Sequence, residues 1–122
     1  MSLILIVEDN EKNMKLVRDI LQAKGHQTLE AVTGEEGVAL AREKIPALVL
    51  MDIQLPGISG IEALQRLRAD PVTRSIPVVA VTASVMAQER QKVMAAGFDG
   101  FQGKPISVRE LLETIRRILD KQ

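Results

Sequence analysis

The chain has 122 residues, fewer than the ~150 of an ordinary domain, so we expect one compact domain over residues 1–122. Hydrophobic residues make up 46% and charged residues 26%, which is typical of a globular domain. Sixteen basic and sixteen acidic residues give zero formal net charge, which argues against nucleic-acid or membrane binding through overall basicity. Because the chain has no cysteine, disulfides and thiol catalysis are excluded.

The N-terminal part of the chain predicts a strand, a helix and a second strand. Residues 4–7 form a continuous apolar run, as expected of a strand buried on both faces of a parallel sheet. The next segment has a helical stripe and ends at Gly25, a residue suited to the left-handed turn after a helix. The apolar positions of that stripe are Met14, Val17, Ile20 and Leu21. Residues 27–31 then form a weaker strand.

The second helix has its own start and stop signals. Thr33 and Glu36 fit a capping box, in which the hydroxyl and the carboxylate satisfy opposite free amides at the helix start. Pro46 disfavours helical geometry at Ile45, so we expect this helix to end near Lys44.

A third strand is predicted over residues 47–51, and Asp52 opens the loop that follows it. Pro56 and Gly57 form a turn in that loop. A second capping box spans residues 59–62 and starts a third helix. The inward positions of this helix are Ile61, Leu64 and Leu67.

The last third of the chain predicts two strands, over residues 78–81 and 98–102, and two helices of unequal regularity. The fourth helix has a weak apolar stripe and ends at Gly97; the stripe consists of Val85, Val93 and Met94. A third capping box over residues 107–110 opens the most regular helix of the chain. Its inward positions are Val108, Leu111, Leu112, Ile115, Ile118 and Leu119. The methionine side chains are expected to fill the core.

Five strand–helix units of ~20 to 25 residues predict a doubly wound α/β fold with right-handed crossovers and helices on both faces of a five-stranded parallel sheet. The chain is too short for an eight-unit barrel. Its longest apolar runs are far shorter than the ~20 residues that span a bilayer, so we expect no membrane partner.

The candidate site residues follow four of the predicted strands, at the edge where ligands of parallel sheets bind. They are Glu8 and Asp9, then Asp52, then Thr82 and Ala83, and finally Lys104 and Pro105. Two like charges ~4 Å apart repel by about 4 kcal/mol at an effective dielectric near 20, so three converging carboxylates call for a cation. Oxygen ligands without imidazole or thiolate favour Mg²⁺ or Mn²⁺.

Each of these residues also has an ordinary structural explanation. Glu8 and Asp9 could complement the positive end of the first helix, and Asp52 could be a turn residue. Thr82 could cap a helix, and Lys104 could be a solvated surface lysine. Independent explanations do not predict that all of them meet at one sheet edge, which favours a shared site.

The strand-end residues lie in four motifs that resemble a known family. The motifs are Val7-Glu8-Asp9-Asn10, Met51-Asp52-Ile53-Gln54-Leu55-Pro56-Gly57, Val81-Thr82-Ala83 and Lys104-Pro105. In this order they resemble the CheY-like receiver domain of two-component response regulators, and most of all single-domain DivK-type regulators and the receivers of hybrid sensor kinases. The resemblance covers essentially the whole chain. It implies the flavodoxin-like strand order 2-1-3-4-5, a cytoplasmic protein and no output domain in this chain.

The resemblance also implies a phosphoryl-transfer site. Asp52 would take a phosphoryl group from a phosphohistidine on a sensor histidine kinase or a histidine phosphotransfer protein. Lys104 would supply a positive charge, and Thr82 would donate its hydroxyl to the phosphate near the Ala83 amide. The implied Mg²⁺ ligands are Glu8, Asp9, Asp52 and the backbone carbonyl of Gln54, with Glu8 acting directly or through a water molecule.

A switch to a protein effector follows from the same resemblance. Phe101, three residues before Lys104, would change rotamer as Thr82 moves, and Ala83 is small enough to leave the ring a path inward; a core-filling role for Phe101 is an equal alternative. Pro105 belongs to the same switch. The fourth helix, fifth strand and fifth helix would then bind a downstream protein, with the chain a monomer or a phosphorylation-dependent dimer.

Three other functions were compared with this one. An FMN carrier of the same fold is disfavoured because Glu8 and Asp9 would repel the phosphate. A phosphohydrolase of the haloacid dehalogenase type needs a second acid where this chain has Gln54, so we expect no enzyme acting on external substrates. A pseudo-receiver, which binds partners without phosphorylation, remains the alternative. His26, the single histidine, receives no catalytic role.

Overall fold

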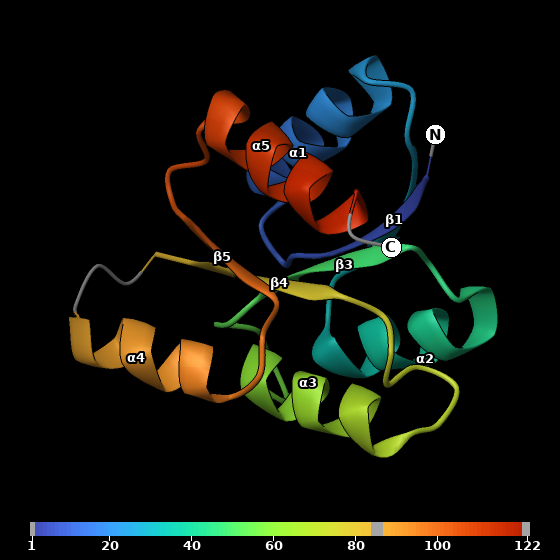
Figure 1. The fold of residues 1–122 in the computed structure, drawn as a ribbon, viewed down its shortest axis with the longest axis vertical. Helices are drawn as coiled ribbons and strands as arrows, with labels where there is room; N and C mark the ends of the chain where they lie inside the picture. Colours follow the sequence, from blue (N-terminus) through green and yellow to red (C-terminus); the bar gives the residue numbers. More distant parts are fainter. Residues whose placement is uncertain (1, 84–86, 121–122) are drawn as a thin grey trace.

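The structure, a computed structural model, describes residues 2–83 and 87–120, which form one parallel sheet between two layers of helices (Figure 1). The strands are β1 (Leu3–Val7), β2 (Gln27–Ala31), β3 (Leu48–Asp52), β4 (Val78–Thr82) and β5 (Gly100–Gly103). All neighbouring strands are parallel, and their order is β2-β1-β3-β4-β5. The doubly wound α/β fold and its strand order are therefore confirmed.

Five helices cover the two faces of the sheet. They are α1 (Glu11–Ala23), α2 (Gly34–Lys44), α3 (Gly60–Ala69), α4 (Ala87–Ala95) and α5 (Val108–Leu119). Helices α1 and α5 lie on one face, and α2, α3 and α4 lie on the other (Figure 1). Alternate strand residues supply two separate cores: Ile4 and Leu50 pack on the α1/α5 side, while Leu5 and Met51 pack on the other side. Burial on both faces explains why the central strands are continuous apolar runs.

The predicted helix starts are confirmed at the three hydroxyl caps. The side chains of Thr33, Ser59 and Ser107 each accept a hydrogen bond from the backbone amide three residues later. At α2 the returning carboxylate bond is displaced by one residue, because Glu36 Oε1 accepts from the amide of Val32 at 2.9 Å. The start of α1 uses a cap that the sequence analysis missed, the side chain of Asn10.

The ends of α1 and α2 follow the predicted stop signals. Gly25 adopts φ +86° just beyond α1, and α2 ends at Lys44. Ile45, before Pro46, is left-handed at φ 47° and ψ 65°, a conformation that costs a side chain about 1–2 kcal/mol. No helix in the described part of the chain is long and apolar enough to cross a bilayer.

Three predictions about individual residues were wrong. Asp52 is the last residue of β3 and buried, so it does not open the loop. Met94 is 45% exposed, because it is rotated by about 100° from its buried neighbour Val93 and cannot point the same way. Val108 is 48% exposed, because it is the first residue of α5, at the end of the packed stripe. Val85, the third predicted position in the stripe of the fourth helix, lies outside the described residues.

Candidate functional site

The carboxyl ends of β1, β3 and β5 bring three carboxylates and one lysine together. Glu8 and Asp9 follow β1, Asp52 ends β3, and Lys104 follows β5. The pairing of Val7 with Met51 places Glu8 beside Asp52 across the sheet. One carboxylate oxygen from each of the three acidic residues lies within 4.8 Å of the other two. Residues that are up to 96 positions apart in sequence therefore share one small volume.

The ammonium group of Lys104 bridges two of these carboxylates. Its Nζ lies 2.9 Å from Asp52 Oδ2 and 3.0 Å from Glu8 Oε1. Both carboxylate side chains are almost fully buried, and Lys104 is 17% exposed. Its backbone amide is held too, because it donates to the carbonyl of Thr82 at 2.9 Å. A single ammonium among three carboxylates leaves the cluster with an excess of negative charge.

The ionisation of Glu8 reflects its burial first and this excess of charge second. Burial, and then the neighbouring carboxyl of Asp52, raise the pKa of Glu8 from 4.5 to about 7, although Lys104 and the amide of Asn10 act in the opposite direction. Burial lowers the pKa of Lys104, but its bonds to Asp52 and Glu8 outweigh burial, so the pKa is raised. Lys104 therefore stays protonated at neutral pH, while Glu8 is poised between its two forms.

The backbone after Asp52 is held against the start of α3. The amide of Gln54 donates to Asp52 Oδ1 at 3.1 Å, and the amide of Gly60 donates to the carbonyl of Ile53 at 2.9 Å. A Cβ on Gly60 would clash with the carbonyl oxygen of Asp52 and lie 2.8 Å from Ile53 Cα. Glycine is thus required at this position for the helix to approach the strand end. In the sequence, residue 60 stands out only as part of a capping box, so this requirement was not predicted.

The remaining predicted residues lie at the same edge of the sheet. Thr82 ends β4 and is buried, whereas Ala83 beyond it is exposed. Gln54 is exposed in the loop after β3. Pro105 is exposed and follows Lys104 through a cis peptide bond. The structure places each of them near the cluster, while their roles in binding phosphate or metal stay predictions.

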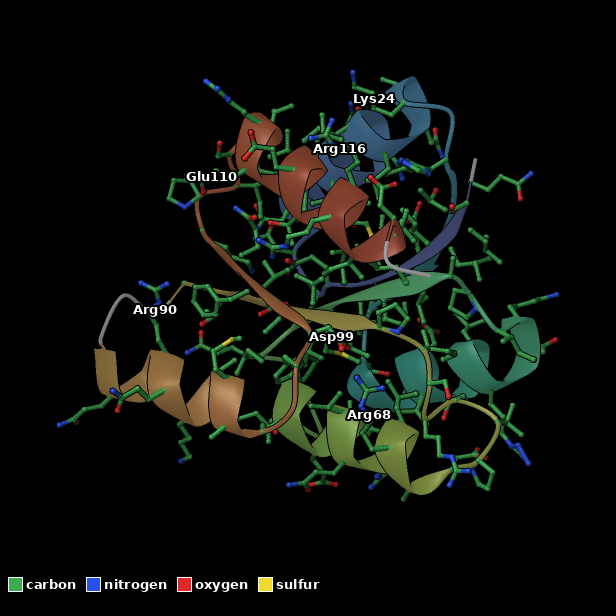
Figure 2. The ribbon with its side chains drawn as sticks, in the orientation of Figure 1. Lys24, Arg68, Arg90, Asp99, Glu110 and Arg116 are labelled. Atoms are coloured by element: carbon green, nitrogen blue, oxygen red, sulfur yellow. The ribbon has the colours of Figure 1, made fainter. Side chains whose placement is uncertain are left out.

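Phe101 on β5 is half-buried and packs against the core on the α2, α3 and α4 side. The guanidinium carbon of Arg90 on α4 lies 4.7 Å from the centre of its ring (Figure 2). Such a cation–π contact contributes about 0.5–1 kcal/mol at an exposed site. The ring is therefore neither free in solvent nor fully inside the core. The contact of Arg90 was not predicted, because the distance between Arg90 and Phe101 in the chain gives no local signal.

The donor set of the cluster fits a hard divalent cation. Glu8, Asp9 and Asp52 offer only oxygen ligands from three carboxylates, with no nitrogen or sulfur ligand among them. Asp9 is exposed, so the set opens to solvent on one side, which suits an ion that keeps several of its waters. The excess negative charge points the same way, since a bound cation would neutralise it.

Comparison with known proteins agrees with this geometry. Residues 4–116 match the response regulator receiver domain family. The chain is 47% identical over 116 residues to the polar-differentiation response regulators DivK of Brucella ovis and Brucella anthropi, covering 95% of this chain and 94% of each relative. The chain therefore belongs to the response regulator receiver domain family, the receivers of two-component signalling.

Solved structures show the same fold over nearly the full length. A response regulator from Chloroflexus aurantiacus J-10-fl superposes with a TM-score of 0.93 at 27% identity, covering 98% of both chains. The receiver domain of sensor histidine kinase PA1611 from Pseudomonas aeruginosa PAO1 superposes with a TM-score of 0.91 at 28% identity, with the same coverage. That structure has a magnesium ion coordinated in its active site cleft. The fold of this chain is thus the CheY-like receiver fold.

Proposed function

We propose that the protein accepts a phosphoryl group on Asp52 from a phosphohistidine of a sensor histidine kinase or a histidine phosphotransfer protein. A carboxylate oxygen of Asp52 attacks phosphorus, the phosphorus–nitrogen bond breaks, and the electron pair leaves with the imidazole. The observation that carries the proposal is the position of Asp52: it is buried at the sheet edge, held at one oxygen by the Gln54 amide and at the other by Lys104. Both bonds orient the carboxylate that would act as the nucleophile.

The acidic cluster would hold Mg²⁺ or Mn²⁺ during this transfer. The proposed ligands are Glu8, Asp9, Asp52 and the backbone carbonyl of Gln54. The ion, when bound, offsets negative charge on the phosphoryl oxygens. Lys104 would then serve as the second positive group, because it already approaches Asp52 from the β5 side. The magnesium ion in the receiver domain of PA1611 supports this reading.

The aspartyl phosphate would act as a switch read by another protein. Phosphorylation adds about −1.5 to −2 charge and three acceptor oxygens, which Thr82 and the Ala83 amide would bind at the end of β4. The change would reach the surface of α4, β5 and α5 through Phe101, with Pro105 in the adjoining turn. Arg90 links α4 to that ring and would move with it. A downstream protein effector would bind that surface, and residues 1–122 would act as one receiver domain of a cytoplasmic signalling protein.

Intact-mass measurement after incubation with acetyl phosphate and Mg²⁺ tests this function. The wild-type chain should gain one phosphoryl group, and the Asp52→Asn variant should gain none. Asp99→Asn is the matched control, because it removes a carboxylate at the other end of the sheet and should still gain one phosphoryl group. An unmodified wild-type chain would contradict the proposal and favour the pseudo-receiver, which signals without phosphorylation.

A further inference from the structure

A groove of about 710 Å³ lies on the α1/α5 face of the molecule, away from the acidic cluster. One wall is formed by α5, and the other by the segment around Lys24 and His26, where α1 passes into β2. Figure 2 shows Lys24 and Arg116 on this side of the sheet, opposite Arg68 and Arg90. None of the four residues Glu8, Asp9, Asp52 and Lys104 lines the groove, so the proposed phosphorylation does not account for it.

The wall formed by α5 carries charges that alternate in sign along one face. Arg109, Glu113, Arg116 and Asp120 line the groove and are all exposed. Steps of four, three and four residues keep them on one side of a helix. Basic and acidic side chains therefore follow one another from the start of α5 to the residue that ends it. A uniformly acidic or uniformly basic partner would meet repulsion at every second position.

These charges form few ion pairs within the described part of the chain. Arg109 and Glu113 form a loose pair at 3.8 Å, with Arg preceding Glu, the less favourable order on a helix. Within residues 2–83 and 87–120, Arg116 and Asp120 form no ion pair with any other side chain. The alternating face is thus available to charges supplied from outside.

The alternation is self-complementary when the helix is reversed. A two-fold axis passing between Thr114 and Ile115 would set Arg109 of one copy opposite Asp120 of another, and Glu113 opposite Arg116. Each charge then meets its opposite, and the symmetry of a two-fold interface repeats both pairs. Leu112 and Leu119, which are half-buried and line the same groove, would be covered by the second copy.

We propose that this face of α5 is a self-association surface, on which a second copy of the chain docks with its own α5 antiparallel. Exposed ion pairs are individually weak and are screened by salt. The dimer is therefore expected at high protein concentration and low ionic strength. Its formation does not require phosphorylation, because no residue of the acidic cluster takes part.

Sedimentation equilibrium of charge-reversed variants tests the proposal. At about 20 mM salt the wild-type chain should form dimers, and their dissociation constant should rise as salt increases to about 500 mM. Arg116→Glu and Glu113→Arg should each raise the dissociation constant at least ~tenfold, because two attractive pairs become repulsive. An equimolar mixture of the two variants should recover the dimer, since every facing pair is again of opposite sign. The double variant Glu113→Arg/Arg116→Glu should also recover it.

The control variant reverses a charge on the other face of the sheet. Arg66→Glu makes the same change of charge on α3, on the other face of the sheet, and should leave dimerisation unchanged. A wild-type chain that stays monomeric at millimolar concentration in low salt would overturn the proposal. So would single variants that dimerise like the wild type, or a mixture that shows no recovery. Phosphorylation measured on the same variants should be unaffected, which keeps this test separate from that of the proposed function.

Discussion

The two ends of the parallel sheet differ in their balance of charge: opposite charges are paired at the amino end, whereas negative charge is in excess at the carboxyl end. At the amino end, Arg68 and Asp99 form a pair at 2.8 Å (Figure 2). Both make further hydrogen bonds: Arg68 donates to the carbonyls of Arg74 and Ile76, and Asp99 accepts from the amide of Val78. At the carboxyl end, one lysine faces three carboxylates. A network in which opposite charges are matched stabilises contacts between segments of the fold. A cluster with net charge can instead attract a ligand of opposite charge. Changes at the two ends should therefore have different consequences.

The largest expected difference concerns Mg²⁺ affinity. Asp9→Asn removes one of three carboxylates from the unbalanced cluster and should weaken Mg²⁺ binding about 100-fold, equivalent to about 2.7 kcal/mol. Since Asp9 is exposed, the fold should be retained. Isothermal titration calorimetry measures the effect, with Asp99→Asn as the matched control that should bind Mg²⁺ normally. Equal affinities in the two variants would remove Asp9 from the site.

A smaller effect is expected from a single methyl group next to the backbone of Asp52, the proposed phosphoacceptor. Gly60→Ala places a Cβ against the backbone of Asp52 and Ile53, and it should lower the free energy of unfolding by about 2 kcal/mol. Urea denaturation measures the free energy of unfolding. Gly103→Ala, also at the carboxyl end but with open space around its Cβ, should change this free energy by less than about 1 kcal/mol. A similar loss of stability in both variants would show that α3 does not pack closely against the end of β3.

Removing one partner at the balanced end should cost stability, and removing one carboxylate at the unbalanced end should not. Asp99→Ala leaves the Val78 amide and Nη2 of Arg68 without the carboxylate that accepts from both, and it should lower the free energy of unfolding by about 1–2 kcal/mol. Asp52→Asn, without Mg²⁺, relieves repulsion with Glu8 and should leave stability unchanged or higher. Urea denaturation compares the free energies of unfolding of the two variants. A larger loss for Asp52→Asn than for Asp99→Ala would contradict the proposed difference between the two ends of the sheet.

Near neutral pH, the smallest of these effects is a pH dependence carried by Glu8. Its pKa of about 7 means that protons compete with Mg²⁺ below neutrality, so affinity should fall by up to about tenfold per pH unit below pH 7. The folded state also binds this proton more tightly than the unfolded state, so without metal the contribution of Glu8 to stability is full below pH 4.5 and declines as pH rises to 7. Titrations at several pH values measure the first effect. Glu8→Gln should flatten it, and an unchanged profile would exclude Glu8 as its source.

Local signals predicted most of the fold. Hydroxyl caps marked three helix starts, Gly25 and Pro46 marked two ends, and strand 27–31 was predicted with its observed bounds. These features depend on neighbours in the chain, so the sequence contains them directly. Met94 and Val108 were misplaced because an apolar residue type does not say which neighbours will cover it.

The candidate site was predicted as a set of residues and not as an arrangement. Strand ends located Glu8, Asp52 and Lys104 at one edge, but nothing in the sequence showed that Lys104 would bridge the other two. The same holds for the ion pair of Arg68 with Asp99, which are 31 residues apart, and for the close approach of Gly60 to the end of β3. Such contacts depend on how distant segments pack, which single-sequence patterns do not encode.

Locating the phosphoryl group in the chain tests directly whether Asp52 is the phosphoacceptor. Borohydride reduces an aspartyl phosphate to homoserine, which peptide mass spectrometry assigns to a position. After treatment with acetyl phosphate and Mg²⁺, the unbalanced end of the sheet should yield homoserine at position 52 alone, and omission of Mg²⁺ should abolish it. Homoserine at any other position, or none in the presence of Mg²⁺, would contradict the assignment of Asp52 as the phosphoacceptor.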